Sequence, residues 1–242
     1  MDWSHQCVAV IPCFNEARRV ADVIRGVQKH LPGVIVVDDG STDGTARIAR
    51  GAGAEVLRHE TNLGKGAALR AAFGRARERG FRWVIMLDGD GQHAAEEMPV
   101  FFKCAQDSFA SLVVGNRMRD VAAMPWLRWF VNRWMSRRLS QMAGVALPDS
   151  QCGFRLVNLE AYARVPLTTQ RFEVESEMLV SFVAAGHRVE FVPVRTIYKN
   201  EASKIHPLLD AWRWFNWWWK LSRSRKAETM GSSLRPAIIT RS

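Results

Sequence analysis

The sequence has few cysteines, no long apolar run and no sign of a leader segment. Its four cysteines among 242 residues show neither a C-x-x-C pair nor zinc-ligand spacing, which favours a reduced cytoplasmic setting over a disulfide-linked or zinc-bound protein. No apolar stretch approaches the roughly 18 residues that cross a bilayer, and no charged region followed by an apolar one marks a signal peptide. We therefore expect a cytoplasmic chain that, if it meets a membrane, lies on its surface.

Three common ligand-binding motifs are absent as well. No G-x-G-x-x-G follows the first apolar strand, so a dinucleotide-binding fold is not expected. The loop around Lys65 lacks the G-x-x-x-x-G-K-[ST] spacing, because Ala67 stands where Ser or Thr is required; Lys65 can still meet a phosphate or simply open a helix. Residues 88–99 begin like a calcium loop, but the sixth position is not Gly and the twelfth is not Glu, so an EF-hand is excluded.

The chain does have enough apolar material for a core, and an excess of positive charge. Hydrophobic residues make up 48% of the sequence and charged residues 24%, which fits one folded α/β domain of ordinary size, alone or with an appendage. The formal net charge of +10 indicates an anionic partner, such as nucleic acid, a phosphorylated ligand or an anionic membrane surface.

A buried strand that ends in two carboxylates organises the rest of the chain. The apolar run 84–87 stops at Asp88 and Asp90, which are separated by one glycine. Ligands of open α/β sheets bind in the crevice at the carboxyl ends of the strands. With the amide oxygen of Gln92, the pair forms an all-oxygen corner suited to Mg²⁺ or Mn²⁺. The alternative is an ordinary solvated turn, since Asp and Gly are common turn residues.

Strand and helix patterns alternate along the first half of the chain. Short apolar runs predict strands, and apolar residues at spacings of 3, 4 and 7 predict helices. The alternation predicts a largely parallel sheet with helices on both faces. The expected strands are 7–11, 34–37, 55–58, 84–87, 112–115, 154–157 and 188–194, and the expected helices include 17–29, 67–79 and 126–142.

Two segments combine tryptophan with cations. The predicted helix 126–142 mixes aromatic residues with arginine, which fits either a membrane-facing or a core stripe. Residues 207–226 are rich in Trp and end in several cations, which is typical of a helix lying in a membrane interface, although a dimer partner is the alternative. We expect a folded domain over 1–206, this amphipathic helix over 207–226 and a flexible tail over 227–242.

Several motifs now point to a family. The N-terminal ones are Val10-Ile11-Pro12-x-x-Asn15-Glu16, Asp38-Asp39-Gly40-Ser41-x-Asp43-Gly44-Thr45, Asn62-x-Gly64-Lys65-Gly66 and Leu87-Asp88-x-Asp90-x-Gln92. They occur in the order seen in family 2 glycosyltransferases, which the chain resembles over roughly residues 6–206. Within that family it resembles the polyprenyl-phosphate (dolichyl-phosphate) mannosyl- and glucosyltransferases. That narrower resemblance rests on Gly115-Asn116-Arg117, Asn132-Arg133, Asp149-x-Gln151-x-Gly153-Phe154-Arg155, and Tyr198 with Ser203-Lys204-Ile205.

The resemblance implies a GT-A fold, the α/β arrangement of nucleotide-diphospho-sugar transferases, and a role for individual residues. The implied metal ligands are Asp88, Asp90 and Gln92. The implied nucleoside contacts are Pro12, Glu16 and Asp39. The implied grip on the acceptor phosphate is Arg117, Arg133 and Asn132. The other implied substrate-binding residues are Lys65, Gln151, Arg155, Lys199 and Lys204. The implied catalytic set is Asp88, Asp90, Arg117 and Arg133.

The implied reaction moves mannose or glucose, with inversion, from GDP-mannose or UDP-glucose to a polyprenyl phosphate. Mg²⁺ or Mn²⁺ would neutralise the leaving diphosphate. A phosphate monoester has a second pKa of about 6 and is already ionised at neutral pH, so no strong base is needed. The resemblance places the protein on the inner face of the cytoplasmic membrane, with no nucleic-acid partner.

Three alternatives remain. A family 2 enzyme acting on a hydroxyl group needs a base, commonly from a Glu-Asp motif and often with Gln-x-x-Arg-Trp further on; neither motif is present, but Asp149, Glu173, Glu175 or Glu177 could serve. A nucleotidyltransferase would have a glycine-rich, arginine-bearing opening loop, which is missing. A non-catalytic basic protein that docks on nucleic acid or lipid would explain the charge, but not acids at the ends of two separate strands.

Overall fold

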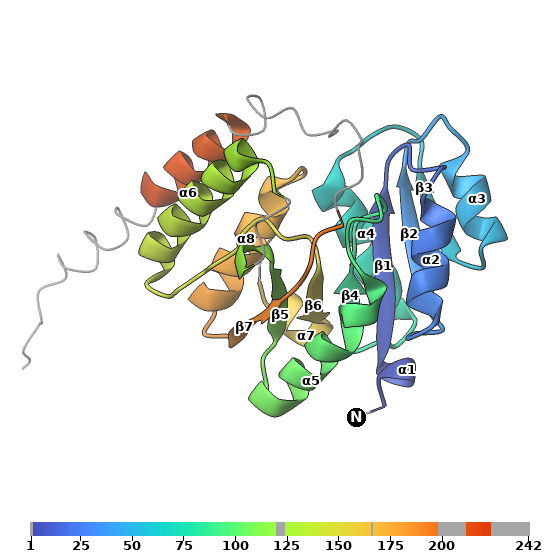
Figure 1. The fold of residues 1–242 in the computed structure, drawn as a ribbon, viewed down its shortest axis with the longest axis horizontal. Helices are drawn as coiled ribbons and strands as arrows, with labels where there is room; N and C mark the ends of the chain where they lie inside the picture. Colours follow the sequence, from blue (N-terminus) through green and yellow to red (C-terminus); the bar gives the residue numbers. More distant parts are fainter. Residues whose placement is uncertain (1, 120–123, 166, 198–211, 224–242) are drawn as a thin grey trace, which may run out of the picture. The chain divides into compact units, whose positions relative to one another are not determined.

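The computed structural model describes residues 2–119, 124–165, 167–197 and 212–223. By its contacts the chain divides into two units, residues 1–200 and 201–242. In the first unit seven strands form one sheet, in the order β3-β2-β1-β4-β6-β5-β7 (Figure 1). The strands are β1 Cys7–Cys13, β2 Val34–Asp39, β3 Glu55–His59, β4 Trp83–Met86, β5 Leu112–Asn116, β6 Arg155–Asn158 and β7 Val189–Pro193.

The sheet is parallel apart from one strand. Strand β1 pairs in parallel with β2 and β4, β2 with β3, and β5 with β7, whereas β6 runs antiparallel between β4 and β5. The predicted α/β class with a largely parallel sheet is therefore confirmed. The carboxyl ends of β1, β2 and β4 meet at one edge, because parallel strands all point the same way.

Helices flank this sheet (Figure 1). They are α1 Trp3–Gln6, α2 Val20–Gln28, α3 Thr45–Gly51, α4 Lys65–Glu78, α5 Met98–Ser108, α6 Trp126–Ala143, α7 Leu159–Tyr162 and α8 Glu173–Ala184, with short 3₁₀ turns at Ala95–Glu97 and Arg117–Arg119. Sequence analysis did not name α5, whose Phe101 and Phe102 are buried in the core.

Helix α2 begins three residues later than predicted. The backbone N–H groups of Asn15, Glu16 and Ala17 donate to side chains of the loop after β2 and of the first residue of α3: Ser41 Oγ at 2.8 Å, Thr45 Oγ1 at 2.8 Å and Asp43 Oδ2 at 3.0 Å. Asn15 also adopts a positive φ of 54°. These tertiary bonds hold 15–17 as a turn, so the regular helix begins only at Val20.

The second unit contains one described helix, over 212–223. Its Trp212, Phe215 and Trp219 are 62%, 40% and 50% exposed. The rings of Phe215 and Trp219 stack along the helix, 6.2 Å apart. Among the described helices of both units, none has the length and apolar character needed to cross a membrane.

Candidate active site

Asp88 and Asp90 lie in the turn that directly follows β4, at the carboxyl edge of the sheet. The turn is closely packed. A Cβ on Gly89 would come 2.5 Å from Cys13 Sγ, and a Cβ on Gly153 would come 2.5 Å from Asp88 Oδ2. Glycine at 89 lets the turn backbone approach β1, and glycine at 153 leaves room for the Asp88 carboxylate beside the segment before β6.

Lys65 forms ion pairs with two acids of the site. Its Nζ lies 2.5 Å from Asp88 Oδ1 and 2.6 Å from Glu175 Oε1. Burial alone lowers the pKa of an amine, but the charges of Asp88 and Glu175 outweigh it and raise the pKa of Lys65. Burial likewise works to raise the pKa of Asp88, and Lys65, with help from His93, overcomes it and lowers that pKa. Sequence analysis left open whether Lys65 meets a phosphate or simply opens a helix. Lys65 is the first residue of α4, and its ammonium also reaches into the acid cluster.

Asp90 differs from Asp88. Its Oδ1 accepts the Gln92 backbone N–H at 2.9 Å, and no cation forms a salt bridge with it in the described part of the chain. Burial, followed by the negative charge of Asp88, raises the pKa of Asp90. A carboxylate left in this state is stabilised by an incoming cation.

The residues fit a hard divalent cation, although the protein supplies only part of a coordination shell. The donors at the turn are oxygens of Asp88, Asp90 and the half-buried Gln92, the type that Mg²⁺ and Mn²⁺ prefer. Within the described ranges, no three His, Cys, Asp or Glu side chains gather closely enough to hold a metal. Water molecules and oxygens of a bound ligand would complete such a shell, as is usual for Mg²⁺.

Sequence analysis missed His93 as a site residue. His93 is 8% exposed, and its Nε2 lies 3.3 Å from Asp88 Oδ2. It also forms an isolated β-bridge with Thr196, next to the bond from Ile197 N–H to Gln92 O at 3.0 Å. The acid turn is thus joined to the segment that follows β7. The only sequence signal for this contact is that His93 directly follows Gln92, a residue already assigned to the site.

The predicted nucleoside contacts lie around the ends of β1 and β2. Pro12 is in β1, and Glu16 lies in the turn held by Ser41, Asp43 and Thr45. Asp39, at the end of β2, already has protein partners. It accepts the backbone N–H groups of Leu63 and Gly64 at 3.0 and 2.8 Å, and its Oδ1 lies 2.7 Å from His59 Nδ1. Asp39 therefore anchors the loop that leads to Lys65.

The predicted acceptor residue Arg117 is buried and paired. Its Nε and Nη2 donate to the two carboxylate oxygens of Asp149 at 2.8 and 2.9 Å, and its backbone N–H donates to the same carboxylate at 3.1 Å. Asp149 is fully buried, and Arg117 is 6% exposed. Burial works to raise the pKa of Asp149, but the Arg117 charge and hydrogen bonds outweigh it and lower that pKa. Two of the three guanidinium nitrogens of Arg117 are thus hydrogen-bonded to Asp149.

Other predicted residues separate into buried and exposed ones. Arg155 is fully buried and donates to the backbone carbonyls of Cys152, Ser150 and Glu175. It therefore stabilises the backbone around the site. Gln151 Nε2 donates to the hydroxyls of Ser150 and Ser176. On α6, Asn132 is buried, whereas Arg133 is exposed with its guanidinium 5.4 Å from the Trp129 ring centre. The remaining two predicted residues, Lys199 and Lys204, lie outside the described residues.

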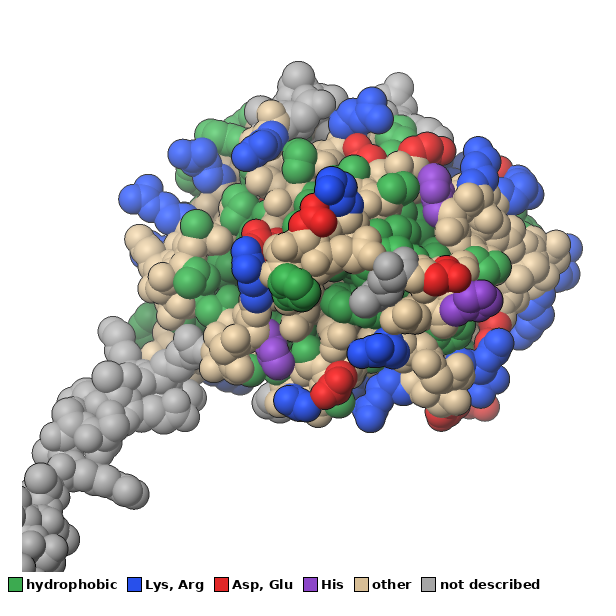
Figure 2. Space-filling model, turned by 90° about the horizontal axis from the view of Figure 1, so that it is seen from below, with side chains coloured by type: hydrophobic (Ala, Val, Ile, Leu, Met, Phe, Trp, Pro, Cys, Tyr) green, Lys and Arg blue, Asp and Glu red, His purple; other side chains and the backbone are tan. Residues whose placement is uncertain are grey.

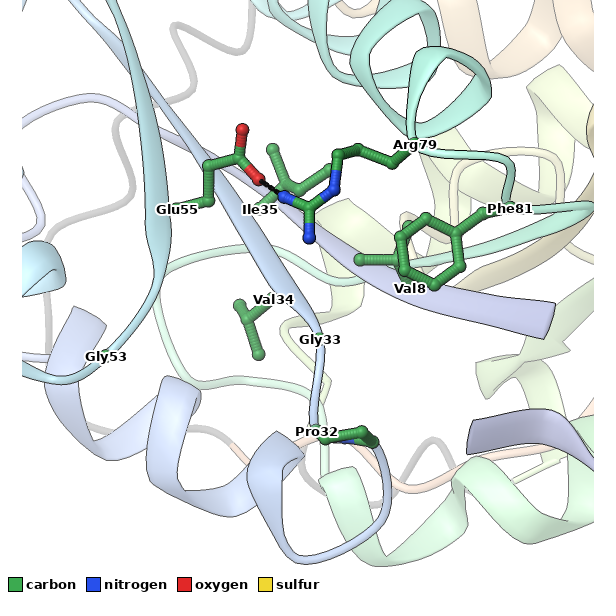
Figure 3. A pocket seen from close by; sticks show the side chains of 9 residues that line it. All are labelled: Val8, Pro32, Gly33, Val34, Ile35, Gly53, Glu55, Arg79 and Phe81. Carbon is green, nitrogen blue, oxygen red and sulfur yellow. Dashed lines mark hydrogen bonds and ion pairs between the residues drawn. The ribbon is translucent and has the colours of Figure 1, made fainter. Parts of the chain in front are cut away.

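The pocket in Figure 3 is a different place. Its cavity of about 190 Å³ is lined by residues that include Val8, Val34 and Glu55, with Arg79 paired to Glu55 at 2.5 Å. Val34 and Glu55 are the first residues of β2 and β3. The pocket therefore lies at the amino ends of the strands, away from the edge where α/β sheets bind ligands.

The sheet order, with an acid pair at the carboxyl end of a central strand, defines a GT-A-like α/β transferase fold. Residues 8–165 match the family model described as glycosyl transferase family 2. The chain belongs to this family and is a glycosyltransferase, which confirms the family-level resemblance.

Curated relatives and solved structures agree. The chain is 33% identical to glycosyltransferase AglJ of Haloferax volcanii over 204 residues, which cover 82% of this chain and 66% of that one. It is 30% identical to undecaprenyl-phosphate mannosyltransferase of Micrococcus luteus over 208 residues, 80% and 84% of the two chains. Crystalline glucosyl-3-phosphoglycerate synthase of Mycobacterium tuberculosis, in complex with Mn²⁺, UDP and glucosyl-3-phosphoglycerate, superposes with a TM-score of 0.66 at 20% identity. That superposition covers 82% of this chain and 73% of that chain, and it shows a shared fold.

Proposed function

We propose that the protein transfers a hexose, mannose or glucose, from a nucleoside-diphosphate sugar to a polyprenyl phosphate. The donor would be GDP-mannose or UDP-glucose. Relatives named for transfer to undecaprenyl, dolichyl and polyprenol phosphates support this acceptor class. An acceptor phosphate oxygen attacks the anomeric carbon, and the bond from that carbon to the diphosphate breaks with its electron pair going to the leaving oxygen. Direct attack inverts the anomeric centre.

On the donor side, Asp88, Asp90 and Gln92 would hold Mg²⁺ or Mn²⁺, which supplies positive charge to the leaving diphosphate. Lys65 adds a fixed ammonium beside Asp88. Pro12, Glu16 and Asp39 remain our proposed lining of the nucleoside pocket, with the Glu16 backbone held in place by Thr45 at the start of α3. These groups bind and orient the donor before the chemical step.

The state of three of the four candidate bases, Asp149, Glu175 and Glu177, is the observation that carries the choice of a phosphate acceptor; the fourth, Glu173, is half-buried at the first position of α8. A hydroxyl acceptor would need a base, but Asp149 is held by Arg117 and its pKa is lowered. Glu175 is paired with Lys65, and Glu177 accepts several hydrogen bonds from Thr168 and Thr169. An ionised phosphate needs no such base.

On the acceptor side, the exposed Arg133 is our proposed cation for a lipid phosphate, and Asn132 neighbours it on α6. Arg117 would contribute through the part of its guanidinium that Asp149 does not use. Exposed Trp126 and Phe130 on the same helix, and the Trp-rich helix over 212–223, are proposed to rest on the inner face of the cytoplasmic membrane.

The test supplies UDP- and GDP-linked hexoses with Mn²⁺ and either polyprenyl phosphate or free polyprenol. We expect a polyprenyl-phosphate hexose from one donor and no product from the free alcohol. Equal use of the free alcohol would reject the phosphate acceptor, and full activity in excess EDTA would reject the metal requirement.

A further inference from the structure

Glu177 has a buried carboxylate on which four donors of one loop converge. The Thr168 backbone N–H lies 3.0 and 3.1 Å from its two oxygens, and the Thr169 N–H lies 3.0 Å from Oε2. The two hydroxyls donate at 2.8 Å, from Thr168 to Oε1, and at 2.7 Å, from Thr169 to Oε2. Because the carboxylate is only 8% exposed, these bonds replace its hydration and fix the loop to α8.

The same loop touches the backbone that carries Lys65. The Gly66 N–H donates to the Gln170 carbonyl at 2.7 Å, and Arg70 Nη1 donates to the Thr169 carbonyl at 2.7 Å. A Cβ on Gly64 would come 2.5 Å from the Gln170 carbonyl oxygen, and one on Gly66 would overlap that of Thr169. The two backbones are therefore in direct contact, which only glycine allows.

Asp39 holds the other side of this segment through the N–H groups of Leu63 and Gly64. Residues 63–66 thus lie between Asp39 and the loop that Glu177 fixes. Lys65 extends from that segment to Asp88, so any shift of the loop moves its ammonium relative to the acid pair.

We propose that Glu177 is a positioning residue that acts through Thr168 and Thr169 to set the place of the Lys65 ammonium beside the donor's diphosphate. The donor contact of Lys65 rests on the proposed function, but the support of Lys65 by Glu177 does not. Among the described residues, the hydrogen bonds of the Glu177 carboxylate go to Thr168 and Thr169. Its neighbour Glu175, in contrast, contacts Lys65 directly.

Hydrogen exchange tests the support without any substrate. Glu177→Gln removes one acceptor oxygen, and we expect faster amide exchange over 62–67 and 167–171 than in the wild-type chain. Thr169→Val, which loses a single hydroxyl, gives a smaller increase that Thr169→Ser reverses. Glu160→Gln, which changes an exposed carboxylate paired with Arg164, is the control and leaves 62–67 unchanged. Wild-type exchange over 62–67 in Glu177→Gln and Thr169→Val overturns the proposal.

Binding of UDP and GDP in the presence of Mn²⁺, measured by calorimetry, tests the consequence. We expect Glu177→Gln to weaken the binding by about tenfold, the lower end of what losing a contact that orients the ligands of a metal site costs. In a Lys65→Met background, Glu177→Gln causes no further loss of nucleotide affinity. In the otherwise wild-type chain, Glu177→Gln leaves the KM for the lipid acceptor unchanged. Additive losses, or unchanged nucleotide affinity, overturn the proposal. A wild-type chain that binds nucleotide but does not glycosylate polyprenyl phosphate rejects the proposed function alone.

Discussion

Lys65 and Asp90 lie in one site with opposite charges, and their surroundings differ. The Lys65 ammonium is neutralised by two carboxylates, which raise its pKa. Asp90 accepts a single backbone N–H within the described bonds, and burial and Asp88 raise its pKa. An added cation would therefore interact more favourably with Asp90 than with Asp88, because burial and the Asp88 charge disfavour the ionised form of Asp90.

The first residue-scale prediction concerns Asp90→Asn. The amide oxygen can still accept the Gln92 N–H, so we expect the thermal midpoint to be unchanged or higher, while kcat falls by roughly 10²-fold or more because a metal ligand is lost. Transfer assays with a Mn²⁺ titration and thermal melts provide the measurement. Asp107→Asn, an exposed acid paired with Lys103, should behave as wild type. Undiminished turnover in Asp90→Asn would rule out the metal site.

The second residue-scale prediction concerns Arg133→Ala. An exposed guanidinium that binds a phosphate contributes a charge-assisted bond, so we expect the KM for polyprenyl phosphate to rise about tenfold and the KM for the sugar nucleotide to stay the same. Arg128→Ala on the same helix is the control, because that side chain lies about 140° away around α6. Equal effects of Arg133→Ala on both substrates would reject its assignment to the acceptor.

At the scale of elements, the Arg117–Asp149 pair joins the end of β5 to the segment before β6. The pair is buried, so its two members depend on each other. The folded-state pKa of Asp149 is lowered below its usual 3.8. The stability it contributes is therefore complete above that value and is lost as the pH falls through the folded-state pKa.

We predict that Asp149→Asn lowers the free energy of unfolding at pH 7 by about 3 kcal/mol, because it leaves the Arg117 charge buried without a partner. The deficit should shrink as the pH falls below 3.8, where the wild-type carboxylate also becomes protonated. Urea unfolding at several pH values measures both effects. Arg117→Met combined with Asp149→Leu should recover much of the stability, and a pH-independent deficit in Asp149→Asn would contradict the pairing.

At the scale of the whole molecule, charge and exposed tryptophans support the proposed contact with a membrane. On the face shown in Figure 2, Lys and Arg side chains are spread over the surface with Asp and Glu among them. The exposed tryptophans of the described residues belong instead to two helices, with Trp126 on α6 and Trp212 and Trp219 on the helix over 212–223. Tryptophan favours the depth of lipid headgroups, where the phosphate of a polyprenyl acceptor lies.

We predict that the full chain floats with anionic liposomes at low salt and that a chain ending at His206 floats much less. Each cation near an anionic surface contributes about 1 kcal/mol, so added salt should weaken the binding. The double variant Trp212→Ser and Trp219→Ser of the full chain removes two exposed aromatic rings and keeps the cations. Its flotation therefore measures the contribution of the rings. Equal flotation of the full and shortened chains would reject the anchor, and a concentration-dependent dimer in its place would support the alternative.

The sequence by itself determined the parallel sheet, the place of the acid pair and the family. Buried strands have continuous apolar runs, and the turn after such a strand is local in sequence, so Asp88 and Asp90 could be placed without a structure. Only the tertiary structure decided what the charged side chains contact. Lys65 pairs with Glu175, 110 residues away along the chain, Arg117 with Asp149, 32 residues away, and Glu177 with Thr168, 9 residues away. The folding of the chain brings such groups together. The sequence around a charged residue does not reveal whether its charge will face a ligand or another part of the protein.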